Sequence, residues 1–192
     1  MERSSIQRIA RGFALTACLA LGASSPTAAV RGALANPLEE ATGEIVARNG
    51  YTAVEAELPA GAERVFRALT SQDVVIWWVR PNVFDTRAWQ GEVRAGGHWK
   101  SGGSFRDQPY ETEGDFILVD SPRLLVQTWN AVGKSAPPST VIFRLTPLPG
   151  KRTRLHIIHA GFGNLESARE FGFGWASSLL RLRELLEKES RR

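Results

Sequence analysis

The most regular spacing of apolar positions lies near the C-terminus of this 192-residue chain. Between residues 168 and 186, small and apolar residues recur at steps of three and four, which places them on one face of a helix. Asn164 and a capping box from Ser167 to Glu170 are alternative starts for this helix. The apolar face is formed by Ala168, Gly172, Trp175, Leu179, Leu182 and Leu186. A helix with one apolar face must cover another layer of structure, and we expect that layer to be a sheet.

Two glycines interrupt the same helical pattern. Gly172 and Gly174 flank Phe173, and Trp175 follows directly. Because a glycine inside a helix costs about 1 kcal/mol relative to alanine, the pair indicates that another part of the chain approaches the helix closely. The curved face of a sheet is the simplest candidate, with Trp175 pointing into the space between the two layers. This arrangement favours a pocket.

Alternating apolar and polar positions predict strands over most of the remaining chain. We expect a first strand over residues 42–58, bent at Asn49–Gly50, then a turn and two short helices over residues 62–69 and 71–79. Ser71 is the expected N-cap of the second helix, and a turn is expected at residues 101–104. The further predicted strands cover residues 84–93, 110–119, 123–129, 140–146 and 153–160, with another starting at residue 98. Short turns between successive strands predict an antiparallel sheet.

The N-terminus has the features of a secretory signal. Three arginines precede the apolar run over residues 12–23, and cleavage is expected after Ala29 or Ala35. We therefore expect a signal peptide over residues 1–29, a flexible segment over 30–43, a folded domain over 44–189 and a tail over 190–192. Export to the periplasm or the medium follows from this interpretation. A lipid anchor at Cys18 and an unprocessed cytosolic tail are the alternatives.

Charge, hydrophobicity and cysteine content limit the kinds of partner and cross-link that we expect. The net charge is +4, and removal of residues 1–29, with three arginines and one glutamate, leaves about +2. Such a domain gives no reason to expect nucleic-acid binding, which needs clustered Lys and Arg. An apolar run of twelve residues is too short to span a bilayer, so we expect no stable membrane insertion after processing. Cys18 is the only cysteine, so the processed domain contains no disulfide.

Several short motifs resemble the START-like, helix-grip superfamily (SRPBCC), and within it the activator of heat-shock-protein-90 ATPase homologue group. The resemblance covers residues 44–187, and it rests on the order and spacing of the motifs. These are residues 59–70, Trp77–Trp78, residues 93–99, 114–122, 123–129 and 153–155, His159–Phe162 and Gly174–Trp175. The resemblance implies an α+β fold in which a curved antiparallel sheet grips a long C-terminal helix, with two short helices after the first strand. It also implies an internal cavity between sheet and helix.

The polar residues do not form a recognisable catalytic or metal site. His156 and His159 are three positions apart on a predicted strand, so they point to opposite faces and cannot share a metal ion. The chain lacks a Gly-x-Ser-x-Gly nucleophile elbow and a phosphate loop. Glu111 and Glu113 share one face, which we interpret as solvated. We assign no catalytic residue, metal or cofactor.

Aromatic residues are the better candidates for a binding site. The expected cavity residues are Trp78, Trp99, Trp129, Phe143, His159, Phe162, Phe171 and Trp175. The structural alternative is that these rings simply fill the core. His159 would then be a core histidine bonded to a neighbouring backbone group. Arg94 is either a gate for an anionic ligand or part of a salt bridge at the sheet edge.

Three functions remain open. The first is binding of a small hydrophobic ligand in the cavity, as a carrier or sensor. The second, implied by the resemblance alone, is a co-chaperone-like interaction module that stimulates a heat-shock-protein ATPase. The third is a polyketide cyclase-like enzyme that uses the same cavity. The absence of a convincing polar pair argues against the enzyme.

Overall fold

The computed structural model describes residues 45–133 and 137–191. The elements in chain order are β1 (Val46–Arg48), β2 (Tyr51–Leu58), α3 (Ala62–Leu69), α4 (Val74–Trp77), β3 (Phe84–Gly91), β4 (His98–Phe105), β5 (Gln108–Asp120), β6 (Leu124–Ala131), β7 (Ser139–Leu148), β8 (Arg152–Ala160) and α5 (Leu165–Ser190). The expected signal peptide, the segment over residues 30–43 and Cys18 lie outside the described residues.

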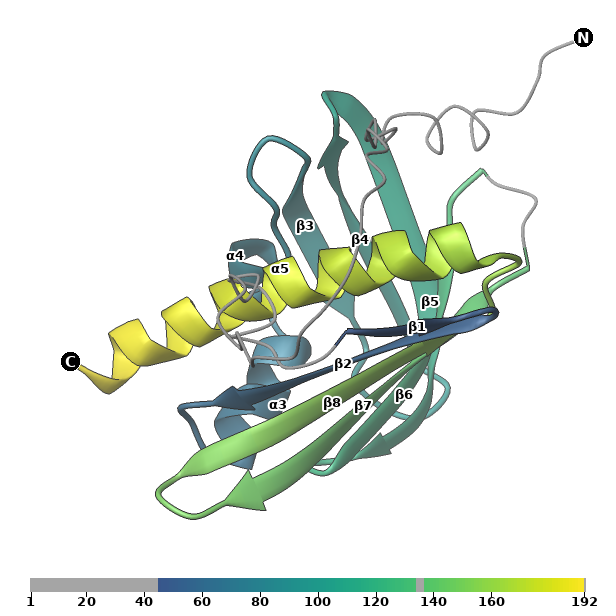
Figure 1. The fold of residues 1–192 in the computed structure, drawn as a ribbon. Coiled ribbons are helices and arrows are strands. Elements are labelled where there is room, and N and C mark those ends of the chain that lie inside the picture. The colour runs from purple at the N-terminus through teal and green to yellow at the C-terminus, as the bar shows by residue number, and fades with distance from the viewer. Residues whose placement is uncertain (1–44, 134–136, 192) are drawn as a thin grey trace, which may run out of the picture. The chain divides into compact units, whose positions relative to one another are not determined.

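Within these residues, eight strands form one sheet in the order β1-β2-β8-β7-β6-β5-β4-β3, and all neighbours are antiparallel. Register shifts interrupt β3 between Thr86 and Ala88 and β5 between Phe116 and Leu118. Such bulges bend a strand and increase its twist. Figure 1 shows the sheet curving around α5, which lies across one of its faces. The predicted α+β helix-grip fold is confirmed.

The alternation of side chains along β2 and β8 explains which face is covered. Every second residue of each strand is buried against the helices, and the residues between them point outward. The inward-facing pairs across the two strands are Thr52–His159, Val54–Ile157, Ala56–Leu155 and Leu58–Thr153. The alternation of side chains along each strand therefore places one set of residues from β2 and β8 in the core, facing the helices.

The long helix α5 is continuous through its glycines. All six positions of its predicted apolar face are buried. The Asn164 side chain accepts a hydrogen bond from the Ser167 backbone N–H at 2.8 Å, so Asn164 and not Ser167 is the N-cap. A Cβ atom on Gly172 would lie 2.6 Å from the Thr52 hydroxyl, which confirms the close approach. A Cβ atom on Gly174 would meet no atom within 4 Å, so the same prediction is wrong there.

Three local predictions need correction. The first strand is two strands, because the Asn49–Gly50 dipeptide reverses the chain and pairs Arg48 with Tyr51. Residues 101–104 are no turn but lie inside β4, where a Cβ atom on Gly103 would overlap the Asp85 carbonyl. The second helix is shorter than predicted: Asp73 occupies its N-cap position, and the Ser71 hydroxyl accepts from the Asp73 backbone N–H.

No helix within residues 45–133 and 137–191 combines the length and the hydrophobicity needed to cross a bilayer.

Candidate functional site

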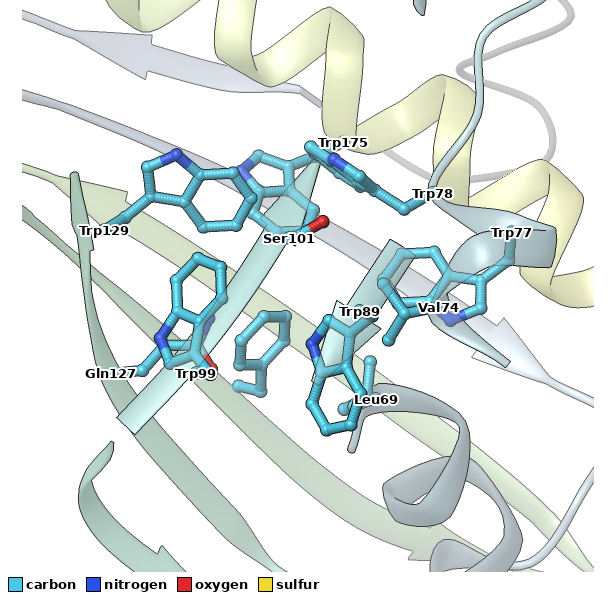
Figure 2. Close-up of a pocket in the computed structure, with 11 residues that line it drawn as sticks. Leu69, Val74, Trp77, Trp78, Trp89, Trp99, Ser101, Gln127, Trp129 and Trp175 are labelled. Carbon is cyan, nitrogen blue, oxygen red and sulfur yellow. The ribbon is translucent and has the colours of Figure 1, made fainter. Parts of the chain in front are cut away.

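All six tryptophans of the chain line one cavity beneath α5. The side chains that line the cavity come from several elements: α3, α4, α5 and the inward faces of β3, β4, β6 and β7. Figure 2 shows the rings gathered around a common space. The lining consists of Leu69, Val74, Trp77, Trp78, Trp89, Trp99, Ser101, Gln127, Trp129, Phe143 and Trp175. The cavity is thus bounded by aromatic surface with two uncharged polar residues.

Ring contacts hold most of these walls in place. Trp78 and Trp175 have ring centroids 4.3 Å apart, and Trp129 lies 5.5 Å from Trp78 and 5.1 Å from Trp99. Tilted and edge-on contacts at these distances are favourable between aromatic rings. The indole N–H of Trp77 donates to the Ala68 carbonyl, and that of Trp99 donates to the Thr128 carbonyl. Ring contacts and hydrogen bonds therefore fix the walls that these five tryptophans form.

The cavity is small. Its volume is about 30 Å³, room for one or two water molecules and far below the 300–1,000 Å³ typical of ligand pockets. The aromatic rings therefore fill most of the space between sheet and helix. A ligand of useful size can enter only if a wall side chain moves.

His159 lies beside the cavity and connects the sheet to α5. The Trp175 indole N–H donates to His159 Nδ1 at 3.2 Å, and His159 Nε2 lies 2.7 Å from the Ser139 hydroxyl. An indole can only donate, so Nδ1 carries no proton and Nε2 must donate to Ser139. The Ser139 hydroxyl in turn donates to the Trp129 carbonyl at 3.1 Å. Each polar side-chain atom in this series of hydrogen bonds has a partner when His159 is neutral.

Burial keeps His159 in that neutral state. Its side chain is fully buried, and the loss of hydration lowers the pKa of His159 from 6.5 to about 3. Since both ring nitrogens are occupied by side chains, the expectation of a backbone partner is wrong. The arrangement suits a structural link between helix and sheet, and it offers hydrogen bonding rather than proton transfer.

A second chain of hydrogen bonds holds Trp78, one of the cavity walls. The Thr86 hydroxyl donates to the Trp78 carbonyl at 2.6 Å, which leaves the Tyr110 hydroxyl to donate to Thr86 at 2.9 Å. Burial raises the pKa of Tyr110. This chain fixes Trp78 against the edge of the sheet.

The structure brings together five of the eight predicted cavity residues: Trp78, Trp99, Trp129, Phe143 and Trp175. The other three form an adjacent ring cluster at the start of α5. In it, His159 lies 4.6 Å from Phe162 and 4.8 Å from Phe171, and the two phenylalanines are 4.9 Å apart. This cluster touches the cavity through Trp175 and Trp129 but does not line it.

Arg94 lies away from the cavity. Its side chain is exposed on the loop between β3 and β4 and pairs with Glu92 at 2.6 Å. The structure thus agrees with the salt-bridge alternative, and Arg94 does not line the space that it was proposed to gate.

Sequence reasoning missed four polar or aromatic members of the lining. Trp77 and Trp89 lie in elements that the sequence predicted, but neither was assigned to the cavity. Thr86 faces inward, and only the register shift between Thr86 and Ala88 turns Trp89 to the same face, so plain alternation along β3 would have placed Trp89 outside. Ser101 was missed because its glycine neighbours led us to predict a turn at residues 101–104. Gln127 alternates with Leu125 and Trp129 along β6, so its inward position could have been found.

A larger hollow of about 280 Å³ lies on the opposite face of the sheet. The outward-facing residues Ala88, Gln90, Lys100, Gly102 and Glu111 form it, together with Trp89 and Ser101, which also line the aromatic cavity. Lys100 and Glu111 pair across it at 3.1 Å. Because the two charged residues of this hollow already pair with each other, the aromatic cavity is the stronger candidate despite its smaller volume.

The carboxylates near β5 face solvent. Glu111 pairs with Lys100, and Glu113 and Asp115 lie 3.7 and 2.9 Å from the ring nitrogens of His98. Among residues 45–133 and 137–191, no group of three or more His, Cys, Asp or Glu side chains is arranged to hold a metal ion.

Comparisons with known proteins agree with this architecture. Protein Ms6760 from Mycobacterium smegmatis has 17% sequence identity and a TM-score of 0.66, and the match covers 76% of this chain and 96% of that one. Protein CV1439 from Chromobacterium violaceum has 21% identity and a TM-score of 0.64, covering 73% of this chain and 99% of that one. At such identities the likeness concerns the fold. No curated protein matches the chain.

A family-wide sequence comparison gives the more specific result. The family described as "Activator of Hsp90 ATPase homolog 1-like protein" matches residues 59–187, from the turn before α3 to the last turns of α5. This match and the helix-grip fold agree, and the chain therefore belongs to the activator of Hsp90 ATPase homologue 1-like family of the START-like superfamily.

Proposed function

We propose that the protein binds a small hydrophobic molecule in the aromatic cavity between the sheet and α5, as a carrier or sensor. The observation that carries the proposal is the convergence of all six tryptophans on one space. Indole rings present large, rigid apolar surfaces with a polar edge, which suits contact with an apolar ligand. The helix-grip fold supports the proposal, because its sheet and helix enclose such a space.

Binding requires the cavity to expand, and Trp89 is the wall best placed to move. It is only half buried and lies on the edge strand β3. Its ring makes no aromatic pair within residues 45–133 and 137–191, whereas Trp78, Trp99, Trp129 and Trp175 all do. Displacement of Trp89 would therefore break fewer contacts than displacement of any of those four rings.

Titration with prodan, a neutral dye whose emission shifts to the blue in apolar surroundings, tests the proposal. We expect one dye per protein, a blue shift, and loss of tryptophan emission. Trp89→Ala should bind the dye about three- to tenfold tighter, because it supplies the missing volume. Its stability should fall by about 1–3 kcal/mol, less than for a fully buried tryptophan.

Phe173→Ala is the matched control, since Phe173 is an exposed aromatic residue of α5 outside the cavity. It should leave dye affinity unchanged. Failure of a folded wild-type protein to bind prodan or any co-purified apolar molecule, checked by native mass spectrometry, would remove the proposal. Equal effects of the two substitutions would place binding elsewhere.

A further inference from the structure

The cavity lining restricts the charge of a ligand. None of its eleven residues is Asp, Glu, Lys, Arg or His. His159, the imidazole beside the cavity, has both nitrogens bonded to neighbouring side chains. A carboxylate or an ammonium group entering this space would lose its hydration without meeting an opposite charge. The site therefore selects against ions.

The shape of the lining restricts the ligand further. The tryptophan walls meet one another at ring-centroid distances of 4.3 to 5.9 Å in tilted and edge-on arrangements. A flat ring that displaces Trp89 can continue this pattern, because aromatic pairs gain energy from offset and edge-to-face contacts. A flexible alkyl chain would fill the same volume without these contacts.

Ser101 supplies an unused polar group in this apolar space. It lines the cavity from β4, is only 4% exposed, and its hydroxyl has no hydrogen-bond partner in the part of the chain that the structure describes. Ser101 is a hydrogen-bonding neighbour of the Tyr110 hydroxyl and slightly lowers the pKa of Tyr110, the weakest of the influences on that group, but the contact does not have the geometry of a full hydrogen bond. A buried hydroxyl without a partner is unusual in folded proteins.

Thr112 repeats the feature on the next strand. It pairs directly with Ser101 across β4 and β5, is 8% exposed, and its hydroxyl also lacks a partner among the described residues. Two neighbouring buried hydroxyls on the same inward face can together accept and donate hydrogen bonds. Figure 2 shows the Ser101 side chain among the indole rings.

We propose that the cavity takes an uncharged aromatic molecule with one hydrogen-bonding substituent, whose ring packs on the tryptophans and whose substituent bonds to Ser101, backed by Thr112. This inference rests on the proposed function, because it names the ligand class of the same cavity. It also gives a role to two buried hydroxyls that lack a partner among the described residues, one in the cavity wall and one on the neighbouring strand.

Equilibrium dialysis with three probes of one ring size tests it at neutral pH: naphthalene, 1-naphthol and the anion 1-naphthoate. We expect 1-naphthol to bind about tenfold tighter than naphthalene, the effect of one well-made hydrogen bond. Naphthoate should bind most weakly. Ser101→Ala should remove the advantage of naphthol and leave naphthalene affinity unchanged.

Ser178→Ala is the matched control. Ser178 lies on α5, is fully buried and also lacks a partner among the described residues, but it does not line the cavity. This variant should keep the naphthol preference, and thermal unfolding should show that both variants are folded. Equal binding of naphthalene and naphthol, a preference that survives Ser101→Ala, or tightest binding of naphthoate would each overturn the ligand class and leave the proposed function standing. Binding of none of the three probes to the folded wild type would overturn both.

Discussion

His159 shows how a single buried residue ties the helix to the sheet. Its tautomer is set by Trp175, which can only donate, and its neutrality is set by burial. Protonation would place two donors against each other at Nδ1. The residue therefore stabilises the fold only as the neutral imidazole.

This state predicts a pH dependence of stability. The pKa of His159 is about 3 in the folded protein, whereas a histidine in the unfolded chain has its ordinary pKa of 6.5. Below pH 6.5 the unfolded chain therefore binds a proton that the folded protein does not. The contribution of neutral His159 to the free energy of unfolding is therefore fully present above pH 6.5 and decreases as the pH falls toward 3. Between pH 7 and pH 5 the contribution lost is about 2 kcal/mol.

Urea unfolding of the wild type and of His159→Gln across this range measures the effect. Glutamine can accept from Trp175 and donate to Ser139 without titrating, so the variant should lack this part of the pH dependence. The difference between the two proteins cancels the contributions of carboxylates and other histidines. Parallel stability profiles would show that His159 does not carry the effect.

For single residues, the face of the strand on which a side chain lies was predictable, but its hydrogen-bond partners were not. Alternation along residues 153–160 correctly turned His159 inward and His156 outward. The bonds of His159 to Ser139 and Trp175 join three separate elements, and no local pattern contains that information. Ser101 was missed for a related reason, since neighbouring glycines are typical both of turns and of closely packed strands.

The helix α5 carries the contacts that close the fold. Gly172 lets it approach β2, where Thr52 is held by its hydrogen bond to the Val46 carbonyl at 3.0 Å. Gly174, two residues later, meets nothing. The two glycines of the predicted pair therefore have different roles.

Alanine at each position separates these roles. Gly174→Ala should raise the free energy of unfolding by about 1 kcal/mol, the gain in helix propensity. Gly172→Ala should lower it by about 1–3 kcal/mol, because the new methyl group would overlap Thr52 and Ile45. Chemical denaturation of both variants measures the two values. Equal effects of the same sign would contradict the close approach at Gly172.

Elements with a strong local period were predicted well. The helix over residues 62–69 and the apolar face of α5 match the structure residue by residue. The errors lie where residues typical of turns are compatible with more than one local structure. Asn49–Gly50 reverses the chain instead of bending one strand, and residues 101–104 continue a strand, because pairing with distant segments decides each case.

For the whole molecule, the sequence predicted a curved sheet with a helix across it but not the size of the space between them. That space depends on how all six tryptophans pack together, and packing is a property of the assembled core. The structure leaves about 30 Å³, so the account requires a cavity that opens when a ligand enters.

The six tryptophan indole N–H groups give the most direct test of this account, because every one belongs to a residue of the cavity. In ¹H–¹⁵N correlation spectra recorded during titration with prodan, we predict that most of the six indole signals shift, that of Trp89 most strongly. Backbone signals of outward-facing residues such as Arg144 and Ile158 should stay in place. Saturable binding that moves these outer signals and leaves the indoles unchanged would contradict the account.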